Sequence, residues 1–385
     1  MDRVKIFVLG NGFDLAHELP TKYTDFLHFS RVVLELLNGN FEDVNWLGIN
    51  SKLKEVIIEN TGNKRDNLYS QEGVWRNLIE NNFWFTHFQN CYISDGWIDF
   101  ESEISKVIQQ IEDALINGLN PFFSIGPNLE TEAIEVKYVE EIIYKLENTR
   151  RYNQDKLIDD ACDKLLKDLN KLIRALELYL VDYVGNMKVD VKSPDIEGIH
   201  PTNVLSFNYT DTFNEVYVPI KGVQYDFIHG KASNTSTLET NNMVIGIDEY
   251  LPDDRKDKYV KFVAYKKYYQ RIFKSTGCLY KNWVDVLHGP TYKEGSGDVI
   301  LIPDNHEVHI FGHSLDVTDK DVLRDLILSP YAETTIYYFD NDVLGKKITN
   351  LVKVIGPDEL VKKTGGSTKT ITFKQQADMI SAVRK

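Results

Sequence analysis

The feature that most constrains the fold is a short apolar run near the start of the chain that ends in glycines. Residues 4–9 (VKIFVL) are apolar apart from one lysine, and Gly10-Asn11-Gly12 follows directly. A short run rich in large apolar and β-branched residues, ended by glycines, is typical of a buried parallel strand that enters a tight loop. The run therefore predicts the first strand of an α/β sheet.

Runs of the same kind recur in the second half of the chain. They are residues 203–207 (NVLSF), 225–229 (YDFIH), 243–247 (MVIGI), 308–312 (VHIFG) and 335–339 (TIYYF). Each ends at or just before Gly, Asn or Asp, as expected where a strand leaves a sheet. Strands that alternate with loops and helices predict a Rossmann-like α/β fold with a parallel sheet.

The middle of the chain has helical periodicity instead. Apolar residues step by three and four through residues 156–184 and again through 97–116, and residues 130–146 give a third helix. We therefore predict a discontinuous nucleotide-binding core of residues 1–30 and 200–356. A helical insertion of residues 31–199 interrupts this core after the first strand and helix, and residues 357–385 form a C-terminal tail.

Composition excludes several classes of protein. Aromatic residues make up 12% of the 385 residues, which is too much apolar mass for a disordered chain. The formal net charge of −14 argues against wholesale coating of nucleic acid. Cys91, Cys162 and Cys278 lie far apart without a CxxC pair, which suits a reducing cytosol. No apolar stretch is long enough for a membrane span, so we expect a cytoplasmic protein without membrane contact.

Polar residues cluster at the predicted strand ends. They are Asp14 after the glycine turn, Asn208 and Asp211 after the second strand, His229 in IHG, and the group that follows Gly312. Ligands of open α/β sheets bind outside the carboxyl ends of the strands. A single Asn or His there is more often structural, but four polar strand ends together favour a site.

Four motifs, in this order, resemble one known family. The strings LGNGFDLAHELPTKYTDF, LSFNYTDTF, IHG and IFGHSLDVTDKDVL resemble the bacteriophage abortive infection (AbiH) family of bacterial phage-defence proteins. The same order is more distantly similar to the sirtuin-like NAD-binding fold. The resemblance implies an antiphage effector that binds NAD or a related nucleotide and hydrolyses its N-glycosidic bond.

The resemblance also implies roles for individual residues. It places His229 as general base, Asn208 on the nicotinamide ribose or a water, and Asp211 beside them. The resemblance implies that Gly10, Gly12, Ser314 and Asp316 line the nucleotide pocket. The same two strand-end motifs add the candidate cofactor-binding residues Asn11, Phe13, Asp14, Gly312 and His313. Loss of NAD would fit an abortive-infection role, and a nearby carboxylate favours the developing oxocarbenium charge.

The sequence departs from the sirtuin pattern in ways that keep other functions open. Deacetylating sirtuins carry four zinc-binding cysteines that this chain lacks, and Asp14 lies close to where a phosphate would be. Residues 255–281 carry nine Lys or Arg and one acid, with Phe262, Tyr265, Tyr269 and Ile272 predicted on one helical face. A solvated charged face is the favoured interpretation. The alternatives are a nuclease or nucleic-acid-binding effector that uses this helix, and a non-catalytic nucleotide sensor.

Two further sets of side chains have ordinary interpretations. His306, His309 and His313 resemble metal ligands, but His306 precedes the strand that carries the others, so we predict core or pocket-lining histidines and no metal. Asp99 and Glu101 lie in a predicted first helical turn, where the dipole favours acids, although they could also reach the pocket. The sequence leaves open a homo-oligomer and does not identify a phage-derived trigger.

Overall fold

The computed structural model describes residues 3–39, 44–62, 72–95, 98–116, 151–217, 221–248, 260–294 and 301–382. Residue contacts divide the chain into two compact units. The sheet unit comprises Met1–Thr21, Met187–Ala232 and Lys274–Lys385, and the helical unit comprises Lys22–Asn186 and Ser233–Phe273. The chain therefore passes more than once between the units.

The sheet unit is built on a parallel sheet of six strands within the described residues. The strands in spatial order are β4 (Gln224–Phe227), β3 (Asn203–Ser206), β1 (Lys5–Leu9), β7 (His306–Phe311), β8 (Ala332–Tyr338) and β9 (Ile371–Gln375). The first strand lies between β3 and β7, with Val8 opposite Leu205 on one side and Ile310 on the other. The predicted α/β fold with a parallel sheet is confirmed.

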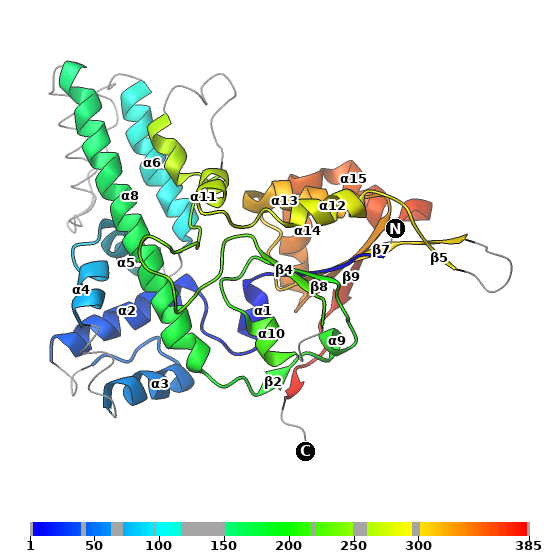
Figure 1. The fold of residues 1–385 in the computed structure, drawn as a ribbon, viewed down its shortest axis with the longest axis horizontal. Helices are drawn as coiled ribbons and strands as arrows, with labels where there is room; N and C mark the ends of the chain where they lie inside the picture. The colour runs from blue at the N-terminus through cyan, green and yellow to red at the C-terminus, as the bar shows by residue number, and fades with distance from the viewer. Residues whose placement is uncertain are drawn as a thin grey trace. The chain divides into compact units, whose positions relative to one another are not determined.

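The strand order reverses direction at the first strand. From β1 the chain adds β3 and β4 on one side and then β7, β8 and β9 on the other (Figure 1). This is the strand order of doubly wound dinucleotide-binding folds, in which the crevice at the reversal is the usual place for a ligand. The reversal lies between β1 and β7.

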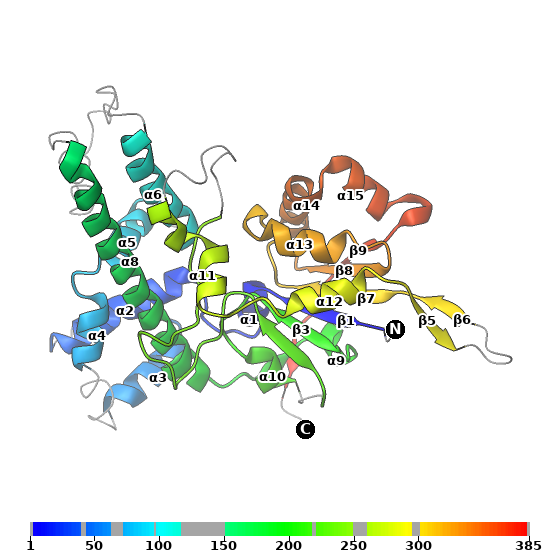
Figure 2. The same cartoon turned by 45° about the horizontal axis from the view of Figure 1, so that its top comes forward.

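Helices cover both faces of the sheet, and the alternation of side chains along β1 explains why. Ile6 and Val8 lie in an apolar cluster with α12 (Tyr280–Leu287), α13 (Lys320–Ile327), α14 (Asn341–Ile355) and α15 (Pro357–Thr364). Phe7 and Leu9 point to the other face and pack with α1 (Asn11–Ala16), α9 (Pro194–Glu197) and α10 (Thr212–Val216). Both views show these helices on opposite sides of the sheet (Figures 1 and 2). A strand buried on both faces has a continuous apolar sequence.

Four of the five later strand predictions are confirmed, and one is wrong. Residues 243–247 are buried but form no strand, apart from one isolated bridge between Ile247 and Lys266. Their backbone groups have other partners, since Gln270 donates its side-chain amide to the Ile245 carbonyl at 3.0 Å. An apolar run alone does not distinguish a strand from a buried loop. The sequence analysis also places β9 in a tail, whereas Ile371 pairs with Thr334 of β8.

The helical unit contains the predicted long helices. Its helices are α2 (Tyr23–Leu37), α3 (Ser51–Gly62), α4 (Glu72–Ile79), α5 (Phe83–Asp95), α6 (Phe100–Ile116), α8 (Arg151–Asp182) and α11 (Lys267–Phe273). The apolar face of α8 is buried at Ile158, Leu165, Leu169, Leu172 and Leu176. Trp84 of α5 donates its indole N–H to the Leu165 carbonyl at 2.8 Å. The helix predicted at residues 130–146 lies outside the described residues.

Residues 233–273 belong to the helical unit, although they fall inside the predicted core segment of residues 200–356. The Glu177 carboxylate on α8 is fully buried and accepts from the Ser233 backbone N–H at 3.0 Å and from the Asn241 side chain at 2.5 Å. The Tyr265 hydroxyl donates to the Cys162 carbonyl at 2.8 Å. These contacts hold residues 233–273 against α8. No local pattern in the sequence predicts them.

Smaller elements complete the described chain. Two antiparallel pairs join β2 (Val191–Lys192) to β10 (Ile380–Ser381) and β5 (Thr291–Glu294) to β6 (Leu301–Asp304). The short 3-10 helices are η1 (Val184–Asn186), η2 (Val260–Tyr265), η3 (Val317–Asp319) and η4 (Gly366–Thr368). Across the described helices, none combines the length and apolarity that a membrane crossing requires.

Candidate functional site

At the strand-order reversal, the loops after β1 and β7 are in direct backbone contact. The Gly12 N–H donates to the Gly312 carbonyl at 2.8 Å, and the Gly10 N–H donates to Phe311 at 3.0 Å. A Cβ at Gly312, where φ is +72°, would lie 2.1 Å from the Phe13 backbone nitrogen. The three glycines are thus explained by close packing of two loops. The amides of Gly10 and Gly12 donate to backbone carbonyls, so they do not form a phosphate cradle in this conformation.

Asp14 is a carboxylate buried next to the end of β3. The Thr210 hydroxyl donates to Asp14 Oδ2 at 2.5 Å. Burial raises the pKa of Asp14 from its ordinary value to about 6, while hydrogen bonds from Thr210, Thr212 and Asn208 act in the opposite direction. A carboxyl group with this pKa exchanges its proton near neutral pH, as a general acid or base must.

A cavity of about 10 Å³ adjoins this carboxylate, room for roughly one water molecule. Its polar lining comprises Asp14, Ser206, Asn208, Thr210, Asp211, Thr212 and Tyr225. Neither amide atom of Asn208 makes a hydrogen bond of standard geometry within the described part of the chain, although the side chain lies close enough to Asp14 to lower the pKa of that carboxyl. The cavity as it stands accommodates a water rather than a nucleotide base.

His229 and His313 share one carboxylate. His229 follows β4 and His313 follows β7, and both are buried. Asp319, the last residue of η3, lies with Oδ1 3.5 Å from His229 Nε2 and Oδ2 3.4 Å from His313 Nε2. The Phe207 ring packs edge-on against both imidazoles, at centroid distances of 5.6 and 4.2 Å. The structure brings together the two predicted histidines and adds Asp319, which is not among the predicted site residues.

Lys347 of α14 is a further buried charged group beside His313. Its ammonium donates to the His313 carbonyl, and burial lowers the pKa of Lys347 to about 8. Lys347 is not among the predicted site residues. The available signal is its position, since Lys347 occupies the buried stripe of α14 with Leu351 and Val354. A lysine at an apolar position of an amphipathic helix is a candidate for function.

The remaining predicted residues have local structural contacts. Asn11 accepts from the Thr21 hydroxyl at 2.6 Å, and Phe13 is fully buried in the apolar cluster below the sheet. Asp316 caps η3 by accepting from the Thr318 N–H at 3.1 Å, and the Ser314 carbonyl accepts from Asn350. Asp211 pairs with Lys231 at 2.7 Å. Asp211 therefore lines the cavity, and its carboxylate is already paired with the Lys231 ammonium.

The histidines of β7 do not converge. His306 is fully buried, accepts from the Val4 N–H at 2.9 Å and lies 3.1 Å from the Gly289 carbonyl. His309 contacts Glu307 at 2.8 Å, and His313 follows the strand rather than lying on it. The prediction that His306 precedes the strand of the other two is wrong, because His306 is the first residue of β7 and His313 lies beyond its end. The prediction of core or pocket-lining histidines is confirmed for His306 and His313, which are buried.

Comparison with known proteins adds the family. A family model described as "Bacteriophage abortive infection AbiH" matches residues 6–340. The chain belongs to this AbiH family. Its role is accordingly in phage abortive infection. No curated protein sequence matches the chain. The matched span of this AbiH protein includes Asp14, His229, His313 and Asp319, whereas Lys347 lies beyond it.

The basic segment of the AbiH protein is not one continuous helix. Among its described residues, η2 is a short 3-10 helix and α11 a separate short α-helix. Phe262 and Tyr265 are buried, whereas Ile272 is exposed. Lys267 is buried and pairs with Glu101 at 2.7 Å. The prediction of a solvated charged face is therefore wrong at Lys267, because this side chain is buried beside the Glu101 carboxylate.

The two acids at the start of α6 also have structural partners. Asp99 accepts from the Glu101 N–H at 3.0 Å, as a residue before a helix does, and Glu101 holds Lys267. Both contacts lie within the helical unit. The structural interpretation of these acids accounts for them fully.

Proposed function

We propose that this AbiH protein acts in phage defence by hydrolysing the N-glycosidic bond of a nucleotide, with NAD as the first substrate to test. His229 is the general base, oriented by Asp319. Asp14 and Asn208 hold the attacking water in the cavity that they line. The proposal combines the family assignment with the chemistry of the sheet edge.

The observation that carries the proposal is the carboxylate shared by two buried imidazoles. With Asp319 Oδ1 3.5 Å from His229 Nε2, an imidazolium formed during proton transfer has a counter-charge at hand. The second oxygen is engaged by His313, which keeps Asp319 from turning away. A base, a group that orients it and an ionisable carboxyl are what hydrolysis of a glycosidic bond requires.

Asp14 supplies the second ionisable group. A carboxyl with a pKa of about 6 can stabilise positive charge at the sugar carbon when ionised and can donate a proton when protonated. The adjacent cavity has the size of the attacking water. Asn208 lines this cavity with amide atoms suited to hold a hydroxyl group.

The part of the ligand that these groups suit is the nucleoside rather than the pyrophosphate. Gly10 and Gly12 donate their amides to the neighbouring loop, and the acidic residues Asp14 and Asp319 would repel phosphate. Ribose hydroxyls, in contrast, donate hydrogen bonds to carboxylates. The choice of NAD comes from the sequence resemblance to sirtuin-like proteins, and other nucleosides share the same bond.

One experiment distinguishes this function from two others. Purified full-length protein is incubated with NAD and, separately, with RNA, and nicotinamide release and strand cleavage are followed. Nicotinamide release that His229→Ala abolishes supports the proposal. Cleavage of RNA alone would support a nuclease instead. A rise in melting temperature with NAD, without turnover, would support a nucleotide sensor.

Two variants separate catalysis from folding. Asp319→Asn should lower kcat by at least about 100-fold and move the acidic limb of the pH–rate profile to lower pH, because the imidazolium loses its counter-charge. His309→Gln is the matched control, since His309 pairs with Glu307 within β7, away from the strand ends. Equal losses in His229→Ala and His309→Gln would point to misfolding and remove the assignment of His229.

A further inference from the structure

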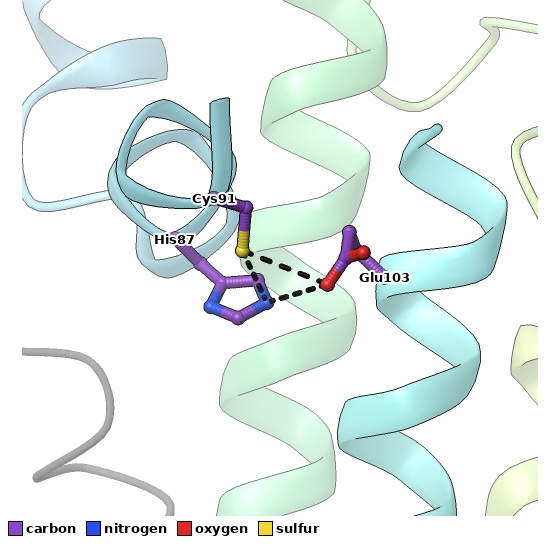
Figure 3. A group of neighbouring side chains, drawn as sticks. All are labelled: His87, Cys91 and Glu103. Carbon is purple, nitrogen blue, oxygen red and sulfur yellow. Dashed lines mark hydrogen bonds and ion pairs between the residues drawn. The ribbon is translucent and has the colours of Figure 1, made fainter. Parts of the chain in front are cut away.

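A second cluster of chemically active side chains lies in the helical unit, within α5 and α6. His87 and Cys91 are four residues apart on α5, so they project from the same helix face. Glu103 lies in the first turn of α6. Figure 3 shows all three side chains pointing toward one another. Their donor atoms lie within 4.8 Å of one another.

We propose that His87, Cys91 and Glu103 bind a divalent transition-metal ion, with Zn²⁺ as the ion of matching chemistry. The proposal is independent of the sheet-edge site and departs from the expectation of no metal, which considered only the histidines near β7. The strand-end motifs do not indicate this site.

The distances fit a metal ion. Cys91 Sγ lies 3.7 Å from His87 Nε2 and 3.6 Å from Glu103 Oε2, and the nitrogen and oxygen are 3.8 Å apart. A point at the centre of such a triangle is about 2.1 Å from each corner, and bonds from zinc to these donors are roughly 2.0–2.3 Å long. In a tetrahedral site the same donor pairs would be roughly 3.3–3.6 Å apart. The triangle therefore needs only a slight contraction.

The donor types select the metal. Thiolate, imidazole and carboxylate together suit zinc and related borderline ions, whereas calcium and magnesium prefer oxygen donors alone. Three protein donors leave a fourth position for water, as in catalytic rather than structural zinc sites. The site thus has the composition to bind zinc and an open coordination position.

Neighbouring residues hold the donors in place. The His87 ring stacks on Phe83 at a centroid distance of 5.7 Å with an interplanar angle of 8°, and it also contacts Trp84 and Phe88. Lys106 donates to Glu103 Oε1 at 2.6 Å, so Oε2 is the oxygen that faces the other two donors. An apolar surround and a fixed carboxylate orientation are the features that support metal ligands.

The test is metal binding by the full chain. Protein freed of metal with a chelator is titrated with Co²⁺, while thiolate-to-cobalt charge-transfer absorption is followed, and Zn²⁺ is then added in competition. We expect one Co²⁺ per chain with this absorption, displaced by Zn²⁺. Cys91→Ser should abolish the absorption and weaken Zn²⁺ binding by at least about 100-fold, since loss of outer-shell partners alone costs 10–100-fold.

Two more variants control the result. Glu103→Gln keeps the size of the side chain and should weaken Zn²⁺ binding while leaving the circular dichroism unchanged. Cys278→Ser removes an exposed thiol outside the cluster and should bind as the wild type does. Binding without thiolate absorption, binding unaffected by Cys91→Ser, or no binding by the wild type would each overturn the proposal.

Discussion

The sheet unit and the helical unit each hold a histidine beside a carboxylate, but they assemble these groups differently. At the sheet edge, His229 follows β4, His313 follows β7 and Asp319 ends η3, and a Cβ at Gly10 would lie only 2.4 Å from the His313 Cα. In the helical unit, His87 and Cys91 are placed by one helix repeat, and only Glu103 comes from another element. The first arrangement depends on the packing of the whole sheet. The second depends mainly on local periodicity, so it should tolerate substitution better.

The largest effect should follow from breaking the loop contact at the sheet edge. In Gly312→Ala, the new Cβ would meet backbone atoms of Phe13 and Gly12 at 2.1 and 2.6 Å, at a position with positive φ. We expect a loss of more than about 3 kcal/mol in the free energy of unfolding, measured by urea denaturation.

A glycine in the same unit provides the control. A Cβ added at Gly345 of α14 would have no atom within 4 Å, so Gly345→Ala should stabilise the protein by about 1 kcal/mol. Similar changes in both variants would show that the Gly312 contact does not limit stability, and the contrast between the two units would fail.

An intermediate effect should come from the buried carboxylate. Asp14 ionises at pH about 6 in the folded protein but near pH 4 in the unfolded chain, so the folded state holds its proton more tightly. Stability should therefore fall as pH rises from about 4 to about 6, by about 3 kcal/mol in total, and stay lower above that range.

Asp14→Asn should remove this pH-dependent part. Relative to the wild type, the variant should gain stability between about pH 4.5 and about pH 7, measured by urea denaturation at both values. The hydroxyl of Thr210 can still donate to the amide oxygen. Parallel pH profiles for the two proteins would contradict the raised pKa of Asp14.

The smallest effect should follow from substitution in the helical unit. Cys91 is partly exposed, and its thiol donates to Glu103 at 3.6 Å, so Cys91→Ala should cost no more than about 1 kcal/mol in chelator-treated protein. With Zn²⁺ at about 100 times its Kd, the wild type alone should gain about 2.7 kcal/mol, measured by thermal denaturation. A large loss without metal would mean that the cluster is a packing element.

Local sequence patterns predict most of the fold. The apolar runs at β1, β3, β4, β7 and β8 and the periodicity of α8 are visible because burial repeats with the period of each element. The strand prediction at residues 243–247 is wrong because a buried loop can be as apolar as a strand. Strand β9 carries exposed polar residues along most of its length, so it gives no apolar run that would predict it.

The candidate sites are predicted less completely. His229 and His313 can be named because parallel strands end at one edge of a sheet, and so their motifs fall together. The contact of both histidines with Asp319 cannot be predicted from the sequence, because it depends on how η3 turns after β7. Lys347 lies in none of the strand-end motifs, and its only sequence signal is its place in the apolar stripe of α14. Its contact with the His313 carbonyl becomes evident only from the packing of α14.

The sequence by itself determined the kind of fold, the edge of the sheet that collects polar groups and the resemblance to AbiH proteins, because these follow from period, residue type and motif order along the chain. Only the tertiary structure decided that Gly12 meets Gly312, that two histidines share Asp319, and that Glu103 faces His87 and Cys91. These contacts bring together residues that are far apart in the sequence, and they depend on loop geometry and helix packing. Their energy is set by burial and by distances of a few ångströms, which no local pattern records.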